Sequence, residues 1–369
     1  MKKTRKIASL TMVLCLLAAL LAGCAGTGGT EANTASPSAS PEASASASPS
    51  AESTGPQTVV DALGNSVQVP ATVKSICATY PAADAIVLML GGGDKLVATT
   101  DYNAKNALFA RMLPKITTLP QPFADLTAGN VEQAMSLAPD VIITSGQSNL
   151  DILKNAGLTA VAVNTSSIKD LQFTVDLIGQ ILGGDAVQKA ADLIDYYNAN
   201  IELCTSRTDS IAEADRPTVF YSAGAVLTTE AIGSIVTEWI ELAGGINVAA
   251  ANGVKGMFVD VTQEELMKWD PDIIVCRDAA TKDEYAKDPT LSKLSAVKNG
   301  KVYVNPMGLY TWCVRSADEA IQPLWAGTVI QPELFSDIDM VKETRDFHSK
   351  FYGLDLTDDE INAILFPAP

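Results

Sequence analysis

The sequence predicts an α/β fold of two doubly wound lobes joined by a long helix. Short apolar runs alternate with helical segments between residues 73 and 163, and the alternation restarts between residues 217 and 330. This strand–helix–strand order is typical of a parallel sheet with helices on both faces. Between the two stretches, residues 185–211 contain few helix breakers and many apolar residues at helical spacing. At roughly 1.5 Å per residue they predict a helix of about 40 Å, long enough to connect two lobes.

The first half of the body is expected to alternate as follows: strands at 73–78, 95–99, 140–144 and 160–163, and helices at 82–90, 130–137 and 152–156. Pro81 stands at the expected start of a helix, and Asn130 is expected to cap another. Gly91-Gly92-Gly93 is interpreted as a helix stop, because no Gly-Lys-Ser/Thr follows it as in a phosphate loop.

The second half repeats the pattern. Strands are expected at 217–221, 273–276 and 300–304, and helices at 234–242, after Thr262, and at 319–330. The segments NVEQAMSLAPDVIITS and VTQEELMKWDPDIIVCR share a helix cap, an early glutamate, a Pro-Asp pair and an apolar strand. Matching halves of this kind predict two related lobes, although a weak repeat can also arise from convergence. The expected boundaries are 57–183 for the first lobe, 184–213 for the joining helix and 214–369 for the second lobe.

The first 23 residues have the composition of a secretory signal peptide. Lys2, Lys3, Arg5 and Lys6 precede an apolar run over residues 7–21, and small residues follow. The run is short for a membrane span. Leu-Ala-Gly-Cys at 21–24 resembles the lipobox of bacterial lipoproteins. The resemblance implies cleavage after Gly23 and lipidation of the Cys24 thiol, with acyl chains contributing roughly 0.8 kcal/mol per buried methylene. The alternative is an ordinary signal peptide with a chance cysteine.

Residues 24–56 are expected to form a tether between the lipid and the folded body. Ser, Ala, Gly and spaced Pro dominate this stretch, and large apolar side chains are nearly absent. Such a composition cannot bury enough surface to offset chain entropy, so we expect disorder. The chain would then lie on the extracytoplasmic face of a cell membrane, either at the cell surface or in a periplasm, because the residues after Cys24 do not decide whether an outer membrane exists.

The acidic charge excludes several functions. Without the four basic residues of the signal peptide, 22 basic residues face 43 acidic ones, a net charge of −21. Nucleic-acid binding needs a basic face, and adhesion to anionic lipids needs basic residues. We therefore expect no nucleic-acid partner, and membrane attachment through the lipid alone.

Cysteine and histidine usage argues against an enzyme or a metal centre. Cys77, Cys204, Cys276 and Cys313 show no CxxC spacing, and Cys77 and Cys276 lie in apolar runs typical of a core. A disulfide cannot be paired from the sequence. His348 is the one histidine, in a segment interpreted as a surface helix with an apolar face through Val341, Phe347 and Phe351. We expect it to be either an exposed helix residue or one whose hydrogen bonds are satisfied. The sequence shows neither a nucleophile–base pair nor a multi-histidine metal site.

Taken together, residues 59–365 resemble the iron-siderophore and vitamin B12 class of ABC-transporter substrate-binding lipoproteins. The likeness is carried by DALGNSVQVP, YPAADAIVLMLGGGDKLVATTDY, the two Pro-Asp segments, KNGKVYVNP and FYGLDLTDDEINAIL. The resemblance implies two lobes joined by one rigid helix, a ligand cleft between them, no cofactor and a monomer. Its implied partners are a permease dimer with its ATPase.

Open α/β sheets bind ligands at the carboxyl ends of their strands, which predicts the residues of the cleft. The candidates are Tyr80, Tyr102, Gln147, Tyr221, Phe258, Arg277, Tyr310, Trp312 and Arg315. The cluster Tyr310, Trp312 and Arg315 combines aromatic surface with a forked cation, which suits a large ligand with planar faces and anionic oxygens. The alternatives are core packing for Trp312 and, for Arg315, a salt bridge with Asp318 or Glu319.

This residue set favours a metal chelate, a ferric siderophore or haem first and a corrinoid such as cobalamin next. A bare oxyanion such as molybdate or tungstate would use the arginine and the tyrosine hydroxyls and fewer rings. A sensory or adhesive surface lipoprotein is the remaining alternative.

Two glutamates are predicted to dock the permease. In cobalamin-binding members of the family, one glutamate on each lobe enters an arginine pocket of the permease dimer, and Glu132 and Glu264 match those positions. Exposed carboxylates on two lobes can steer a cationic partner. The alternative is that both are helix N-terminal acids, worth about 0.3–1 kcal/mol each, and the neighbouring Glu265 could take the place of Glu264.

Overall fold

The computed structural model describes residues 55–123 and 128–368. The chain divides into two units, Met1–Ala51 and Glu52–Pro369. The signal peptide, Cys24 and nearly all of the tether lie outside the described residues, so the assignments made for them stay predictions. Within the described part, no helix is both long and apolar enough to cross a membrane.

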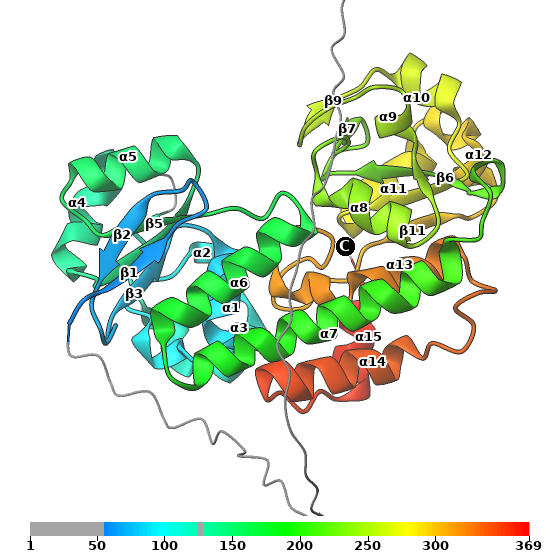
Figure 1. Cartoon of the computed structure of the whole chain (residues 1–369). Coiled ribbons are helices and arrows are strands. Elements are labelled where there is room, and N and C mark those ends of the chain that lie inside the picture. The colour runs from blue at the N-terminus through cyan, green and yellow to red at the C-terminus, as the bar shows by residue number, and fades with distance from the viewer. Residues whose placement is uncertain (1–54, 124–127, 369) are drawn as a thin grey trace, which may run out of the picture. The chain divides into compact units, whose positions relative to one another are not determined.

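A parallel three-stranded sheet in the order β3-β4-β5 forms the first lobe, with α1 packed on β3 and α5 packed on β4 and β5 (Figure 1). The strands are apolar and buried on both faces, as expected where helices cover a parallel sheet. The elements are β1 (Gln57–Val60), β2 (Ser66–Val69), β3 (Ile76–Ala78), α1 (Pro81–Met89), η1 (Gly93–Lys95), α2 (Asp101–Lys105), α3 (Ala107–Met112), η2 (Pro114–Thr118), α4 (Ala128–Leu137), β4 (Val141–Ser145), α5 (Gln147–Asn155), β5 (Ala160–Val163) and α6 (Ile168–Leu182).

The second lobe has a parallel four-stranded sheet in the order β11-β10-β6-β8 and a small antiparallel pair, β7-β9. Its elements are η3 (Glu213–Asp215), β6 (Thr218–Ser222), β7 (Thr228–Thr229), α8 (Ile235–Leu242), β8 (Ile246–Asn247), α9 (Val248–Ala251), β9 (Val259–Asp260), α10 (Gln263–Trp269), β10 (Ile273–Cys276), α11 (Ala279–Lys287), η4 (Leu291–Lys293), α12 (Ser295–Lys298) and β11 (Val302–Val304).

One long helix, α7 (Asp185–Thr208), contacts elements of both halves. It packs against α6 of the first lobe and against η5 (Ala317–Ala320), α8 and α13 (Gln322–Ile330). The chain ends with α14 (Met340–Phe347), the π-helical turn η6 (His348–Tyr352) and α15 (Asp358–Leu365). The predicted two-lobe α/β fold with parallel sheets and a long joining helix is therefore confirmed.

The strand expected at residues 95–99 is wrong. Lys95 ends the 3₁₀ turn η1, and Leu96 makes one isolated bridge to Ile76. The chain leaves the sheet here because the hydroxyl of Thr99 donates to Asp84, 2.7 Å away, and the hydroxyl of Thr100 caps α2. Thr99 and Thr100 thus bond to helix residues, and the pairing with β3 ends after Leu96.

His348 is buried, so an exposed position for it is wrong, whereas the alternative of a hydrogen-bonded helix residue agrees with the structure. The buried face of α14 and η6 runs through Thr344, Phe347, His348 and Phe351, whereas Val341 is 38% exposed. The Nδ1 of His348 lies 2.8 Å from the carbonyl oxygen of Thr344, so Nδ1 carries the proton. Burial lowers the pKa of His348 to about 4, and the ring stays neutral at ordinary pH.

The cysteines are core residues, as expected for two of them. Cys77, Cys204, Cys276 and Cys313 are all free and buried. No described group of three or more His, Cys, Asp or Glu side chains could hold a metal ion.

Candidate ligand-binding site

Several of the candidate residues follow strands at the carboxyl ends of the two sheets. Tyr80 comes two residues after β3 and precedes α1. Arg277 directly follows β10, and Tyr310 lies in the loop after β11. Parallel strands deliver such residues to one edge of a sheet, which is where α/β folds bind ligands.

Tyr310 is one of the residues through which the two lobes make contact. Its ring lies edge-on to the ring of Tyr102, with centroids 5.5 Å apart and an interplanar angle of 75°. A guanidinium nitrogen of Arg277 lies 3.5 Å from the Tyr310 hydroxyl. Beside this contact, the side-chain amide of Asn106 donates to the carbonyl of Leu309 at 3.2 Å. Tyr102, Arg277 and Tyr310 therefore lie together as one group.

Arg315 and Phe258 form the second group. The Arg315 guanidinium carbon lies 4.7 Å from the centre of the Phe258 ring, and Nη2 donates to Glu230 Oε1 at 2.8 Å. Both residues have positive φ, 62° for Arg315 and 54° for Phe258, although neither is glycine. Such backbone strain costs about 1–3 kcal/mol per residue and persists where the surroundings enforce it. The contact between Arg315 and Phe258 is thus imposed by the fold.

The two arginines differ in how much of their charge is free. Arg315 faces Glu230, whose side chain is 1% exposed and also accepts from the Ser234 hydroxyl at 2.7 Å. Within residues 55–123 and 128–368, no carboxylate forms an ion pair with Arg277. Arg277 is therefore the cation that can offer its fork to an anionic ligand.

The tyrosines of the site are hydrogen-bond donors at ordinary pH. Burial raises the pKa of the Tyr80 phenol well above its usual range, with a further increase from Tyr310 and Asp84 and an opposing effect of the Arg315 charge. Burial also raises the pKa of Tyr102. The Tyr80 hydroxyl is buried and has no hydrogen-bond partner among the described residues. A buried donor without a partner is costly, and a bound acceptor would satisfy it.

Two candidates are in the core instead of at the site surface. Tyr221 and Trp312 are both 0% exposed. The Tyr221 hydroxyl lies 3.2 Å from Cys313 Sγ, and its ring packs edge-on to Trp239. Trp312 Nε1 points at Gly308, 3.3 Å from where a Cβ on that residue would lie. Both rings are packed in the core beneath the loop at residues 305–316, and in this structure neither ring is accessible to a ligand.

Gln147 is not brought to the group. It is exposed at the start of α5, and its amide donates to Asp151 one helical turn along, at 2.7 Å. This i, i+4 hydrogen bond within α5 accounts for the position of the Gln147 side chain, so no ligand contact is needed to explain it.

One acidic residue of the site, Glu230, escaped the sequence analysis, and another, Asp318, has a different role from the one considered for it. Glu230, not Asp318 or Glu319, is the ion-pair partner of Arg315. Asp318 instead accepts from the Tyr352 hydroxyl at 2.5 Å and from the backbone N–H of Tyr310 at 3.3 Å, so it supports the loop that carries Tyr310. Burial raises the pKa of Asp318 to about 6. The signal for Glu230 was an acid in an otherwise uncharged stretch directly after β7.

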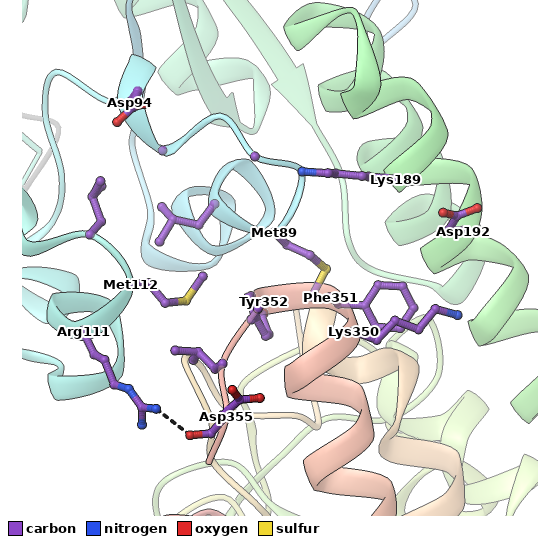
Figure 2. Close-up of a pocket in the computed structure, with 16 residues that line it drawn as sticks. Met89, Asp94, Arg111, Met112, Lys189, Asp192, Lys350, Phe351, Tyr352 and Asp355 are labelled. Atoms are coloured by element: carbon purple, nitrogen blue, oxygen red, sulfur yellow. Dashed lines mark hydrogen bonds between the residues drawn. The ribbon is translucent and has the colours of Figure 1, made fainter.

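A separate cavity of about 720 Å³ lies away from these residues, where α1, α3, α7 and the chain after η6 converge (Figure 2). Its cations and acids are mixed: Lys189, Lys350 and Arg111 stand with Asp94, Asp192 and Asp355. Arg111 already pairs with Glu360 at 2.8 Å and donates to the Asp355 carbonyl. Because the lining carries as many of these cations as acids, its charge favours neither an anionic nor a cationic ligand.

The predicted docking glutamates are both exposed, Glu132 on α4 and Glu264 on α10 (Figure 1). The helix α4 begins at Ala128, not after an Asn130 cap, so Glu132 lies beyond its first turn. Glu265 closes a capping box with Thr262, accepting from its backbone N–H at 2.8 Å. The local explanation therefore accounts for Glu264 and Glu265, which lie in the first turn of α10, but not for Glu132.

Comparison with known proteins decides the family. Residues 76–307 match the family model described as "Periplasmic binding protein". The chain belongs to the periplasmic binding protein family. This family consists of solute-binding proteins that serve ABC transporters, so the protein is the extracytoplasmic binding component of such a transporter.

The relatives bind different ligands. A molybdate-binding protein of Haemophilus influenzae is 24% identical over 80% of this chain and 88% of its own. An iron(3+)-hydroxamate-binding protein of Bacillus subtilis is 23% identical over 79% and 87%. The crystal structure of a periplasmic solute-binding protein from Veillonella parvula has a TM-score of 0.73 and 27% identity, covering 84% of this chain and 97% of that chain.

Proposed function

We propose that this periplasmic binding protein captures a small oxyanion of the molybdate or tungstate kind for import. The observation that carries the proposal is Arg277, a cation without a carboxylate partner in the described chain, held 3.5 Å from the Tyr310 hydroxyl. Tyr80 and Tyr102 add phenol donors to the same group. Charge-assisted hydrogen bonds from arginine and neutral donors suit a compact, oxygen-rich anion.

The sequence analysis favoured a metal chelate because it predicted several accessible aromatic rings in the ligand cleft. The burial of Tyr221 and Trp312 removes two of those faces, which shifts the balance toward the oxyanion. The relative that is named a molybdate-binding protein adds support.

A chelate remains the second candidate, supported by a different observation. Met257 and Phe258 are 42% and 50% exposed and contact Arg315. Ile232, 42% exposed, bridges to Lys255 shortly before them in the chain. An exposed apolar rim of this kind could contact the organic body of a ferric siderophore, haem or cobalamin.

Isothermal titration with a panel of ligands separates the two candidates. We expect molybdate and tungstate to bind with a one-to-one stoichiometry, while a ferric hydroxamate, haem and cobalamin give no heat. Phosphate is the control for non-specific anion binding. Binding of a chelate without binding of either oxyanion would contradict the proposal.

We further propose that the protein is exported by residues 1–23 and anchored by a lipid on Cys24, as a monomer tethered through residues 24–56. Replacing Cys24 by serine is expected to move the protein from the membrane fraction to the soluble extracytoplasmic fraction and to abolish labelling with radioactive palmitate. Cys204→Ser, a buried cysteine far along the chain, is the control. Retention of the Cys24→Ser protein in the membrane fraction would refute the lipid anchor.

A further inference from the structure

Asp84 is a buried carboxyl behind the two tyrosines that the first lobe contributes to the site. It lies on α1, four residues after Tyr80, and is 0% exposed, as are Thr99 and Asn103. Across residues 55–123 and 128–368, no cation forms an ion pair with it. A buried carboxyl without a cationic partner calls for an explanation, because burial of an unpaired charge is strongly unfavourable.

The hydrogen bonds of Asp84 link the segments that carry the tyrosines. Its Oδ2 accepts from the Thr99 hydroxyl at 2.7 Å and from the Asn103 side-chain amide at 2.9 Å. The same amide donates to the carbonyl of Pro81 at 3.1 Å. Asn103 directly follows Tyr102, and Pro81 directly follows Tyr80. One amide therefore fixes the start of α1 relative to α2.

Two buried acceptors in this cluster lack a donor. Asp84 Oδ1 and Asn103 Oδ1 have no hydrogen-bond partner within the described part of the chain. A proton on Asp84 Oδ1 would turn one of these acceptors into a donor. Because the described residues give this buried carboxyl neither a cation nor a donor to Oδ1, its ionised form is costly, and protonation removes that charge.

We propose that Asp84 is a positioning residue of the ligand site, which holds Tyr80 and Tyr102 in place through Thr99 and Asn103 and carries a proton when an anion is bound. The proposal rests on the proposed capture of an anion. A ligand anion next to Tyr80 and an ionised Asp84 would be two like charges in a poorly solvated region, where they repel strongly. Anion binding therefore favours the protonated acid.

The sign of the pH dependence follows from this coupling. Burial raises the pKa of Asp84 to about 7, against the opposing effect of its bonds from Thr99 and Asn103. The facing ionisable groups are Cys77 and Tyr80, and burial raises the pKa of both, so they stay neutral. Below pH 7 the proton is already present and the affinity is constant. Above pH 7 each anion must take up a proton, and the affinity falls.

Neighbouring elements also carry buried ionisable groups. The turns η5 and η6 pack on α1 and contain Asp318, Glu319 and His348. The pKa of Asp318 is about 6 and that of His348 about 4, both below the pH range of about 7 and above in which Asp84 loses its proton. Burial raises the pKa of Glu319 well above its ordinary value, so a variant of Asp84 itself is needed to assign the effect.

The test is isothermal titration with molybdate as the probe at pH 6.5 and pH 8.5. We expect the wild-type affinity to fall by up to about 25-fold over this range, since one linked proton changes affinity by at most tenfold per pH unit above the pKa. Asp84→Asn keeps the shape and an acceptor oxygen but cannot titrate, so its affinity should be equal at both pH values. Asp61→Asn, a buried aspartate of the same lobe, is the matched control and should keep the wild-type dependence.

A second readout needs no ligand. In protein labelled with ¹³C-tyrosine, the ring signals of Tyr80 and Tyr102 should shift with a midpoint near pH 7 in the wild type and remain constant in Asp84→Asn. Thr99→Val should move both signals at every pH. Equal pH dependence of wild type and Asp84→Asn in both measurements would overturn the proposal. A wild type that titrates by its tyrosine signals but does not bind molybdate would contradict the proposed oxyanion and leave the positioning role standing.

Discussion

Replacement of Arg277 by glutamine is expected to weaken molybdate or tungstate binding at least about 30-fold. Removing one partner of a buried, hydrogen-bonded charge pair costs about 2 kcal/mol or more, and about 1.4 kcal/mol corresponds to tenfold. The guanidinium of Arg277 is half-buried beside Tyr310, and no ion pair within the described residues competes for it. Isothermal titration of the purified variant measures the loss.

Two further variants test why Arg277 matters. Arg277→Lys keeps the charge but loses the forked donor, so its affinity should lie between those of the wild type and the glutamine variant. Lys282→Gln removes an exposed positive charge five residues along the chain and should change the affinity less than about twofold, because exposed charges are screened. An Arg277→Gln protein with wild-type affinity would place the ligand elsewhere.

Arg315 should behave differently from Arg277, although the sequence gives the two the same role. Its charge is already paired with the buried Glu230, and its guanidinium covers Phe258. Loss of Arg315 would leave Glu230 as a buried carboxylate without its cation, a strongly destabilising change. We therefore assign Arg315 mainly to the construction of the site and Arg277 to contact with the ligand.

Local patterns were enough to predict most of the parallel strands and the sheet edge at which several candidate residues lie. The apolar run before Arg277, the Pro81 helix start after Tyr80 and the Thr262 cap each have a local cause, and the structure contains each of them. Since parallel strands place their ends together, these positions followed from the alternation of strands and helices.

The orientation of side chains within loops could not be predicted in the same way. Residues 305–316 have no period that separates an inner from an outer face, so Trp312 and Tyr310 looked equivalent in the sequence. Trp312 is buried against Gly308, whereas Tyr310 is half-buried and Asp318 fixes its backbone by accepting from its N–H. The partner of Arg315 is 85 residues away, a distance at which no local pattern operates.

The largest effect on transport is expected from the double variant Glu132→Ala with Glu264→Ala. Ligand affinity should equal that of the wild type, because neither carboxylate contacts the residues of the candidate site. Uptake of labelled ligand in cells should fall at least about tenfold, since close charge pairs between proteins contribute about 1.5 kcal/mol or more each. Each single variant should show a smaller loss, as expected when two lobes bind a two-fold symmetric partner.

The matched control is Glu202→Ala with Glu333→Ala, which removes the same charge from two other exposed positions. Normal uptake by this control and loss in the Glu132/Glu264 variant would assign the effect to position and not to net charge. Glu265→Ala separates a further possibility, because it breaks the capping box of α10 and should lower stability by about 0.5–2 kcal/mol without impairing uptake. Normal uptake in the Glu132/Glu264 variant would refute docking through these residues. Glu264 lies in the first turn of α10, where the helix dipole favours an acid, whereas Glu132 lies beyond the first turn of α4. A cationic partner surface would account for both glutamates at once, and the loss of uptake in the double variant is the result that requires it.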